Sequence, residues 1–193
     1  MTGSQGDLGE FNKCQAQLRE LYKQGLKGQR LEFLGYRILY LVYSRNRAEL
    51  NATMAQLTDA ERLDESVGHA LQVRLAVSQG NYTRLFRLFH AAPKMGAYLM
   101  DHFIGRERVA AMVTLTRAYA PGFPLSLITR QLGFEADADA VAFLAEHKAD
   151  KFKPPPAGQP GIGKDPVVDP KLAGPRFVEA MASLSKVDLK GQI

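Results

Sequence analysis

Proline is distributed very unevenly along this chain, and this distribution constrains the fold more than any other feature of the sequence. Seven of the ten prolines lie between Pro154 and Pro175, where proline and glycine together fill 11 of 22 positions. Because proline lacks a backbone donor and its ring clashes with the preceding turn, helices are not expected to persist in this stretch. We therefore divide the chain into a nearly proline-free body, residues 7–153, and a loop-rich end, residues 154–193.

The body shows the apolar spacing of successive amphipathic helices. Four apolar residues at three- and four-residue intervals precede Gly25, a residue that typically ends a helix. They are Phe11, Cys14, Leu18 and Leu21. Residues 31–43 carry two apolar stripes, which is typical of a helix packed between neighbours, and Gly80-Asn81 indicates a turn. Further helices are expected near 47–57, 64–79, 82–89 and 95–103. We interpret this series as helical hairpins joined by short turns, an α-solenoid.

The pattern changes after Gly105. A helix is expected over 106–119, a short helix that stops at Gly133 follows it, and a third helix begins near Asp137 as its N-cap. A strand at about 149–153, a Pro/Gly loop and a return strand at 167–172 complete the arrangement. Three helices followed by a β-hairpin make a winged helix. The last stretch, 176–189, has weak helical spacing.

The predicted fold is therefore mainly α, an α-solenoid of helical hairpins followed by a C-terminal winged helix. Its expected parts are a helical-repeat part over 7–105, a winged-helix part over 106–172 and a tail over 173–193.

Composition excludes several classes of protein. One cysteine in 193 residues excludes a disulfide framework and a cysteine-based metal cluster. No apolar run approaches the roughly 18 residues that a membrane-spanning helix needs, so no membrane association is expected. The first residues show neither a basic nor an apolar signal region, so we expect no secretion signal and an intracellular protein. The excess of 25 Lys+Arg over 20 Asp+Glu gives a net charge of +5.

The sequence predicts no catalytic, metal-binding or cofactor-binding residue. No two of the four histidines stand three or four residues apart, as a metal-binding helix face requires. They are His69, His90, His102 and His147. Cys14 lies on an apolar stripe and is expected to be a buried thiol. No nucleophile-elbow pattern surrounds Ser126, although a triad with His147 and an aspartate stays open at the level of sequence. We do not expect an enzyme.

Residues 158–164 have the glycine and lysine spacing of a phosphate-binding loop but lack its context. Such a loop needs a preceding strand, a following helix and a Ser/Thr after its lysine. Here Pro154-Pro155-Pro156 precedes the segment, and Asp165 replaces the hydroxyl residue. We interpret it as the tip of the wing.

The second helix of the predicted helix-turn-helix carries carboxylates and no lysine or arginine. The four carboxylates are those of Glu135, Asp137, Asp139 and Glu146. In DNA-binding proteins this helix enters the major groove, where the phosphates would repel such a face. We therefore predict that these four residues dock a protein partner, with a basic partner patch as the complement.

Basic residues cluster instead around the predicted hairpin. They are Arg130, Lys148, Lys151, Lys153, Lys164 and Lys171. Such residues can contact RNA phosphates independently of sequence. Solvated charges on a loop are the alternative interpretation. Phe152 is expected to be buried, and no interleaved aromatics support base stacking.

Three segments together resemble the SAC-three/GANP family. They are residues 6–15 (Gly-Asp-Leu-Gly-Glu-Phe-Asn-Lys-Cys-Gln), 36–40 (Tyr-Arg-Ile-Leu-Tyr) and 80–82 (Gly-Asn-Tyr), the last followed by Arg84, Phe86, Arg87 and Leu88. The resemblance covers roughly residues 6–172, and its nearest branch is the Thp-three and leukocyte-receptor-cluster-member-eight type. It implies a PCI-like fold, in which helical repeats run into a winged helix.

The resemblance also implies a function. It implies a nuclear, non-enzymatic scaffold in mRNA processing and export coupled to transcription, although a cytoplasmic location stays open. A second PCI subunit and a small acidic Sem/DSS-type protein are the implied partners, and the basic cluster around the hairpin adds RNA, bound independently of sequence, as a candidate partner. The alternatives are an RNA-binding module that uses the basic wing, or a proteasome-lid, signalosome or translation-initiation PCI subunit.

Family members usually carry more helices before the Gly-Asp-Leu-Gly stretch, so we expect this chain to be a partial or shortened member. The first helix pair is then expected to lack a packing neighbour. The apolar face left exposed would carry Leu18, Leu21, Leu34 and Leu41.

Overall fold

The computed structural model describes residues 4–120, 122–153 and 165–188 and is mainly helical, which confirms the mainly α part of the predicted fold class. The helices are α1 (Ser4–Lys23), α2 (Arg30–Tyr43), α3 (Arg47–Ala55), α4 (Asp59–Arg62), α5 (Glu65–Ser78), α6 (Tyr82–His90), α7 (Gly96–Ala118), α8 (Leu125–Gln131), α9 (Asp137–Glu146) and α10 (Pro170–Asp188). The strands are β1 (Phe123–Pro124), β2 (Phe152–Lys153) and β3 (Val167–Val168).

The described chain forms two compact units. Unit 1 contains the residues up to 74 together with 93–99, and unit 2 contains 75–92 and the residues from 100 onward. None of the described helices combines the length and apolar character that crossing a bilayer would require.

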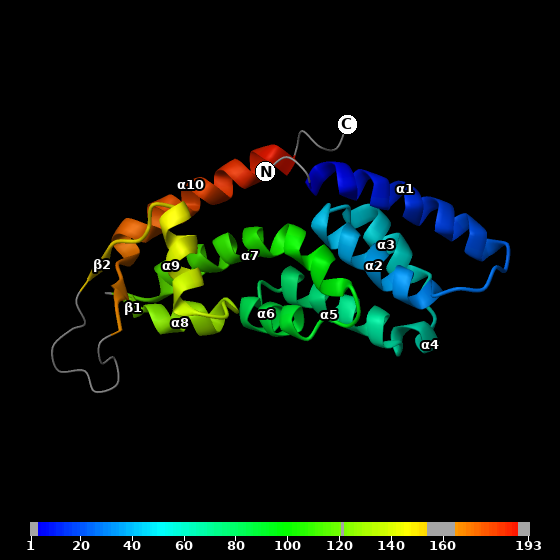
Figure 1. The fold of residues 1–193 in the computed structure, drawn as a ribbon, viewed down its shortest axis with the longest axis horizontal. Coiled ribbons are helices and arrows are strands. Elements are labelled where there is room, and N and C mark those ends of the chain that lie inside the picture. The colour runs from blue at the N-terminus through cyan, green and yellow to red at the C-terminus, as the bar shows by residue number, and fades with distance from the viewer. Residues whose placement is uncertain (1–3, 121, 154–164, 189–193) are drawn as a thin grey trace. The chain divides into compact units, whose positions relative to one another are not determined.

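Unit 1 is built around α2, which is buried on more than one side as its two apolar stripes predict. Ile38, Leu39 and Leu41 are almost completely buried, and α1 and α3 lie beside this helix (Figure 1). Gly35 allows α2 to approach the start of α5, because a Cβ at this position would lie 2.8 Å from the carbonyl oxygen of Ser66.

Turns and caps fix the short helices of both units. The side chain of Asn46 accepts a hydrogen bond from the Glu49 N–H at the start of α3, and Asn81 does the same for Arg84 at the start of α6. Thr58 and Glu61 form a capping box on α4. Such caps satisfy backbone donors that have no partner within the helix. The predicted turn at Gly80-Asn81 is confirmed, and Gly80 has a positive φ of 64°.

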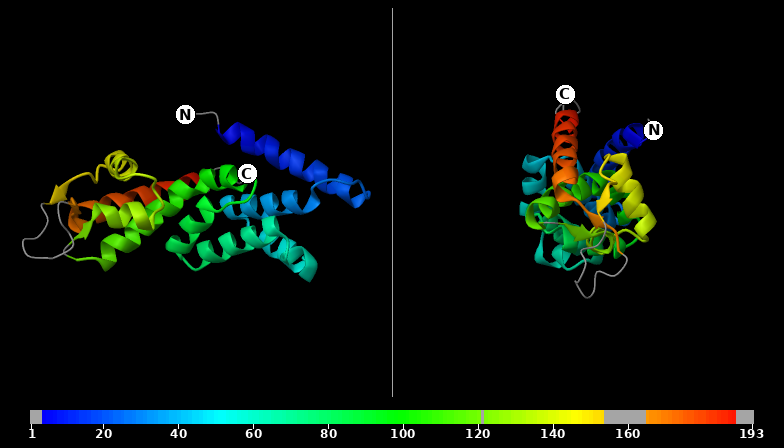
Figure 2. Two further views of the ribbon diagram at one scale, coloured as in Figure 1. Left: turned by 60° about the horizontal axis from the view of Figure 1, so that its bottom comes forward. Right: turned by 90° about the vertical axis from the view of Figure 1, so that its left-hand side faces the viewer.

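In unit 2 the paired helices α8 and α9 lie in the chain between strand β1 and strands β2 and β3, and the three strands form a small antiparallel sheet. The strand order is β1-β3-β2, and Val168 of β3 lies between Phe123 of β1 and Phe152 of β2. Phe123 and Val168 are buried in the core. Figure 2 shows α8, α9 and the strands gathered at one end of this unit. Strand β1 was not predicted, and β2 and β3 are shorter than the strands expected over 149–153 and 167–172.

Helix α10 contradicts the expectation that residues up to Pro175 cannot be helical. Pro170 is its first residue, where a missing N–H costs nothing, and Pro175 lies inside the helix. Phe177 is fully buried and Ala173 nearly so, and α10 runs beside the second half of α7 (Figures 1 and 2), where Gly174 faces Thr116. Packing of this face outweighs the local cost of the internal proline.

Three further expectations are corrected. Separate helices over 95–103 and 106–119 are wrong, because α7 passes through Gly105 without a break. The domain boundary expected at 105/106 therefore falls inside a helix, and the three expected parts stay a prediction. Cys14 is exposed rather than buried, and Phe152 is only half-buried. The loop segment 158–164, interpreted as the wing tip, lies outside the described residues.

Candidate functional site

The four carboxylates predicted to dock a partner are all exposed, but two of them stabilise the start of α9. Asp137 accepts a hydrogen bond from the Thr129 hydroxyl at 2.5 Å, which ties α9 to α8. Asp139 accepts one from the Ala136 N–H at 3.2 Å. Both lie in the first turn, where a negative charge is favourable. The N-cap is Ala136 rather than Asp137, so that prediction is wrong.

Glu135 and Glu146 lie at opposite ends of α9. Both are exposed, Glu135 two residues before the helix and Glu146 as its last residue. Within Asp137–Glu146 there is no lysine or arginine. The exposed surface of α9 is therefore acidic, and these two glutamates are the members of the predicted set that are best placed to meet a partner.

The predicted basic cluster is only partly brought together. Lys153 forms an ion pair of 2.6 Å with Asp169, whose carboxylate also accepts a hydrogen bond from the backbone N–H of Lys171. The Lys153 hydrogen bond lowers the pKa of Asp169 below its ordinary value. Lys153 thus holds β2 to the start of α10. Lys164 lies outside the described residues.

The other members of the basic cluster are exposed but spread over several elements. Arg130 lies in the last turn of α8, Lys148 follows α9, Lys151 precedes β2 and Lys171 lies in the first turn of α10. The described structure therefore leaves four exposed cations that are spread over this part of unit 2.

A half-buried arginine, Arg108, which was not among the predicted site residues, holds the turn between α8 and α9. Arg108 donates from Nε to the Leu132 carbonyl at 3.1 Å and from Nη2 to the Gly133 carbonyl at 3.0 Å. Its guanidinium lies 4.0 Å from the centre of the Phe134 ring. Burial lowers the pKa of Arg108. Arg108 directly follows Arg106 and Glu107 in the sequence, so no isolated charge marked it as a structural residue.

Gly133 is the residue on which this turn depends. It has a positive φ of 61°, as expected for the residue that ends α8. A Cβ there would lie 2.8 Å from Nε2 of His90, and this nitrogen is 3.0 Å from the Gly133 carbonyl oxygen. The predicted helix stop at Gly133 is confirmed.

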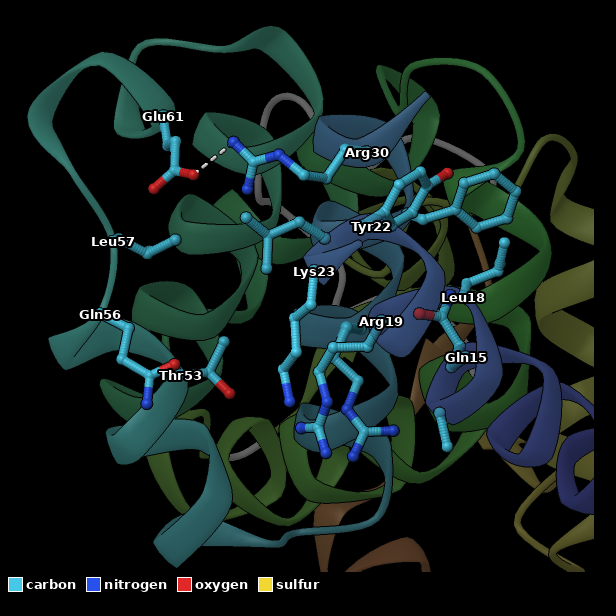
Figure 3. A pocket seen from close by; sticks show the side chains of 14 residues that line it. Gln15, Leu18, Arg19, Tyr22, Lys23, Arg30, Thr53, Gln56, Leu57 and Glu61 are labelled. Atoms are coloured by element: carbon cyan, nitrogen blue, oxygen red, sulfur yellow. Dashed lines mark hydrogen bonds and ion pairs between the residues drawn. The ribbon is translucent and has the colours of Figure 1, made fainter. Parts of the chain in front are cut away.

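Unit 1 contains a groove at the face where an exposed apolar surface near Leu18 and Leu34 was expected. It has a volume of about 470 Å³ and lies among α1, α2, α3 and the start of α4 (Figure 3). Its apolar lining includes Leu18, Phe33, Leu34 and Leu57, and its polar lining includes Gln15, Arg19, Lys23, Arg30, Arg37 and Glu61. Of the four leucines expected on an exposed face, Leu21 is exposed and Leu18 and Leu34 are half-buried, whereas Leu41 is buried.

Ion pairs hold two of the arginines in this groove. Arg30 pairs with Glu61 at 2.6 Å, as the dashed line in Figure 3 marks, and Arg37 pairs with Glu49 and also donates to Asn12. The Thr58 N–H and then the Arg30 guanidinium hold the pKa of Glu61 below its ordinary value. These pairs fix the walls of the groove.

Within the described residues, no three His, Cys, Asp or Glu side chains approach each other closely enough to hold a metal ion. The candidate sites of the described chain are therefore surfaces: the acidic face of α9 in unit 2 and the groove in unit 1.

Comparison with known proteins gives the family. The model of the SAC3/GANP family matches residues 4–151. A THP3 homolog of Schizosaccharomyces pombe is 41% identical over 189 residues, which are 97% of this chain and 45% of that protein. A leukocyte receptor cluster member 8 homolog of Xenopus laevis is 41% identical over 140 residues, 72% of this chain and 18% of that protein.

A third relative has a similar identity. SAC3 family protein A of Arabidopsis thaliana is 42% identical over 134 residues, 69% of this chain and 13% of that protein. The chain thus spans less than half the length of the curated relatives that it matches. It belongs to the SAC3/GANP family, in the branch that includes the THP3 and leukocyte receptor cluster member 8 homologues.

Proposed function

We propose that this chain is a non-enzymatic, PCI-type scaffold subunit in nuclear mRNA processing and export, and that it docks a second PCI subunit through a winged helix. The observation that carries the proposal is the three-stranded antiparallel sheet beside α8 and α9 in a chain of the SAC3/GANP family. A small acidic Sem/DSS-type protein is the further partner that the family resemblance implies.

The order of elements in unit 2 supports a winged-helix interpretation. Helix α7, strand β1 and the helix pair α8 and α9 are followed by β2 and β3, which pair antiparallel as a hairpin would. The paired helices of unit 1 support the solenoid interpretation in the same way, since short turns join successive helices. Together these two interpretations describe a PCI-like module.

The charge of α9 supports a protein partner rather than DNA. Its exposed carboxylates and its lack of lysine and arginine would oppose the approach of a phosphate backbone. The same carboxylates would steer a basic protein surface toward this helix and would contribute to specificity.

The test combines purification with a charge-reversal variant. Tagged protein is purified from cells of its source, and co-purifying subunits are identified by mass spectrometry. We expect a second PCI subunit and mRNA-processing factors, and we expect Glu135→Lys/Glu146→Lys to lose the PCI subunit. This pair avoids Asp137 and Asp139, which stabilise α9. The two reversals also have opposite effects on the helix dipole, so folding is expected to be retained.

The matched control is Glu10→Lys/Glu179→Lys, an equal change of charge on exposed positions of α1 and α10 whose ion pairs with neighbouring residues contribute little. It should retain all partners. Proteasome-lid, signalosome or translation-initiation subunits in place of mRNA factors would refute the proposed pathway, and unchanged partners in the α9 variant would refute the docking face.

An RNA-binding module is the second candidate, because Lys148, Lys151 and Lys171 are exposed around β2 and the start of α10. Since Lys153 is paired with Asp169, the cluster is smaller than the sequence predicts. Absence of RNA binding by the unmodified protein at low salt would exclude this function.

A further inference from the structure

The groove in unit 1 contains a buried polar group that nothing in the described structure satisfies. The side chain of Gln15 lines the groove and is only 6% exposed. Its Nε2 is buried and has no hydrogen-bond partner. Buried amide groups in folded proteins are almost always hydrogen-bonded, so an unpaired one beside a groove points to an acceptor supplied from outside.

The walls of the groove define the chemistry of its occupant. One wall is apolar, with Leu18, Leu34 and Leu57 lining the groove. Arg19 and Lys23, one turn apart on α1, have side chains that are 63% and 62% exposed. Figure 3 shows their charged ends pointing to the same side of the groove. An occupant must therefore combine apolar groups with negative charge.

The two exposed cations are held only weakly within the protein. The carboxylate nearest to Arg19 is Glu49 at 3.9 Å, and Arg37 already pairs with that carboxylate. Lys23 pairs with Glu20 one turn earlier on the exposed side of α1, and such pairs contribute little. Both cations can therefore turn to a carboxylate of an incoming ligand at little cost.

We propose that this groove binds an extended acidic peptide segment of a partner protein. Carboxylates of the peptide pair with Arg19 and Lys23, apolar side chains pack on Leu18 and Leu34, and a backbone carbonyl accepts a hydrogen bond from Gln15 Nε2. The groove, with a volume of about 470 Å³, is as large as typical small-molecule sites of roughly 300–1,000 Å³, so it has room for side chains of the peptide. The apolar wall and the single buried amide favour a peptide over a nucleic acid, whose backbone would need a row of accessible cations.

This site lies in unit 1 and is separate from the acidic face of α9 in unit 2. The groove binds its peptide whether or not α9 docks a PCI subunit, so the failure of one proposal leaves the other standing.

In the experiment, displayed random dodecapeptides are selected for binding to the whole chain. Peptides that also bind the variant Arg19→Glu/Lys23→Glu are then removed. Enriched peptides are resynthesised with a fluorescent label, and their affinities are measured by anisotropy. We expect sequences that combine Asp or Glu with apolar residues and bind more weakly as salt rises. We expect at least tenfold weaker binding to Gln15→Leu and to the double reversal. Lys13→Glu, an exposed cation of α1 outside the groove lining, should bind normally.

Gln15→Leu separates binding from folding, because it removes an unsatisfied amide and should melt no lower than the unmodified protein. The proposal is overturned if no peptide is enriched, if enriched peptides lack carboxylates, or if the groove variants bind them normally. It is also overturned if a labelled oligouridine, rather than any peptide, loses binding in the double reversal. A dimer in sedimentation that the same variants dissociate would instead make the groove a contact between copies.

Discussion

The ring of His147 lies against the rings of Phe143 and Phe177, with centroids 4.9 and 5.1 Å away. At the scale of single residues, this environment changes the pKa of the His147 imidazole. Burial lowers the pKa of His147 below its ordinary value, and the nearby charge of Glu146 opposes the shift only in part. The folded state therefore favours the neutral ring.

The sign of the pH effect follows from that shift. The contribution of His147 to stability is present above an unfolded-state pKa of about 6.5 and is lost as the pH falls through the lower folded-state value. We expect the melting temperature of His147→Phe, measured relative to that of the unmodified protein, to rise as the pH falls from 7.5 to 5. Melting curves by circular dichroism measure this difference, and a constant difference across that range would contradict the prediction.

Several residues act through partners that are distant in sequence, and such contacts could not be predicted from spacing. The Tyr36 hydroxyl donates to Glu32 at 2.7 Å and accepts from the Met95 N–H at 3.0 Å. Tyr36 belongs to residues 31–43, for which two apolar stripes were predicted, and it is buried. The sequence could not place Met95 or Arg108, because a helical period states which face a residue occupies and not what that face meets.

At the scale of elements, two glycines in the middle of helices have opposite roles. A Cβ on Gly35 would meet the Ser66 carbonyl at 2.8 Å, whereas a Cβ on Gly105 in α7 would have nothing within 4 Å. We expect Gly35→Ala to lower the free energy of unfolding by about 1–3 kcal/mol through overpacking. Gly105→Ala should raise it by about 0.5–1 kcal/mol, because alanine favours the helix.

Urea unfolding of the two glycine variants checks both signs. Equal effects at Gly35 and Gly105 would mean that the close approach of α2 to α5 does not constrain the packing. A loss of stability in Gly105→Ala would mean that α7 is not a regular helix at that residue.

The helices that the sequence predicted well are those with local start and stop signals. Asn81 and Gly133 determine their turns through side-chain capping and a positive φ, which depend on a few neighbouring residues. Strand β1 could not be predicted, since two residues that include a proline become a strand only when β3 lies beside them. The weak helical spacing over 176–189 agrees with the second part of α10, but its start at Pro170–Pro175 was missed, because burial of Phe177 stabilises the helix and Pro175 by itself argues against it.

At the scale of the whole molecule, the sites predicted from the sequence were surfaces of charge, and the structure sorts those charges by what each one contacts. Asp137, Asp139 and Lys153 stabilise unit 2, whereas Glu135 and Glu146 are left for a partner. The pattern of charges along the chain cannot make this distinction. A charged residue that stabilises the fold and one that is left for a partner look alike in the sequence. The groove around Gln15 was predicted only in part: Leu18 and Leu34 of the expected exposed face line it, but its polar lining comes together only where α1, α2 and α3 meet.

A subunit that docks a partner only in its folded state should gain stability from that partner. At a free concentration one hundred times the dissociation constant, the gain is about 2.7 kcal/mol. For a chain of 193 residues that corresponds to a rise in melting temperature of roughly 5–10 °C, at 2–4 °C per kcal/mol. We expect this rise when the PCI subunit identified by mass spectrometry is added to the purified chain, and none for Glu135→Lys/Glu146→Lys. A chain that melts at the same temperature with and without that subunit, and stays monomeric in its presence, would contradict the scaffold proposal while leaving the peptide groove untouched.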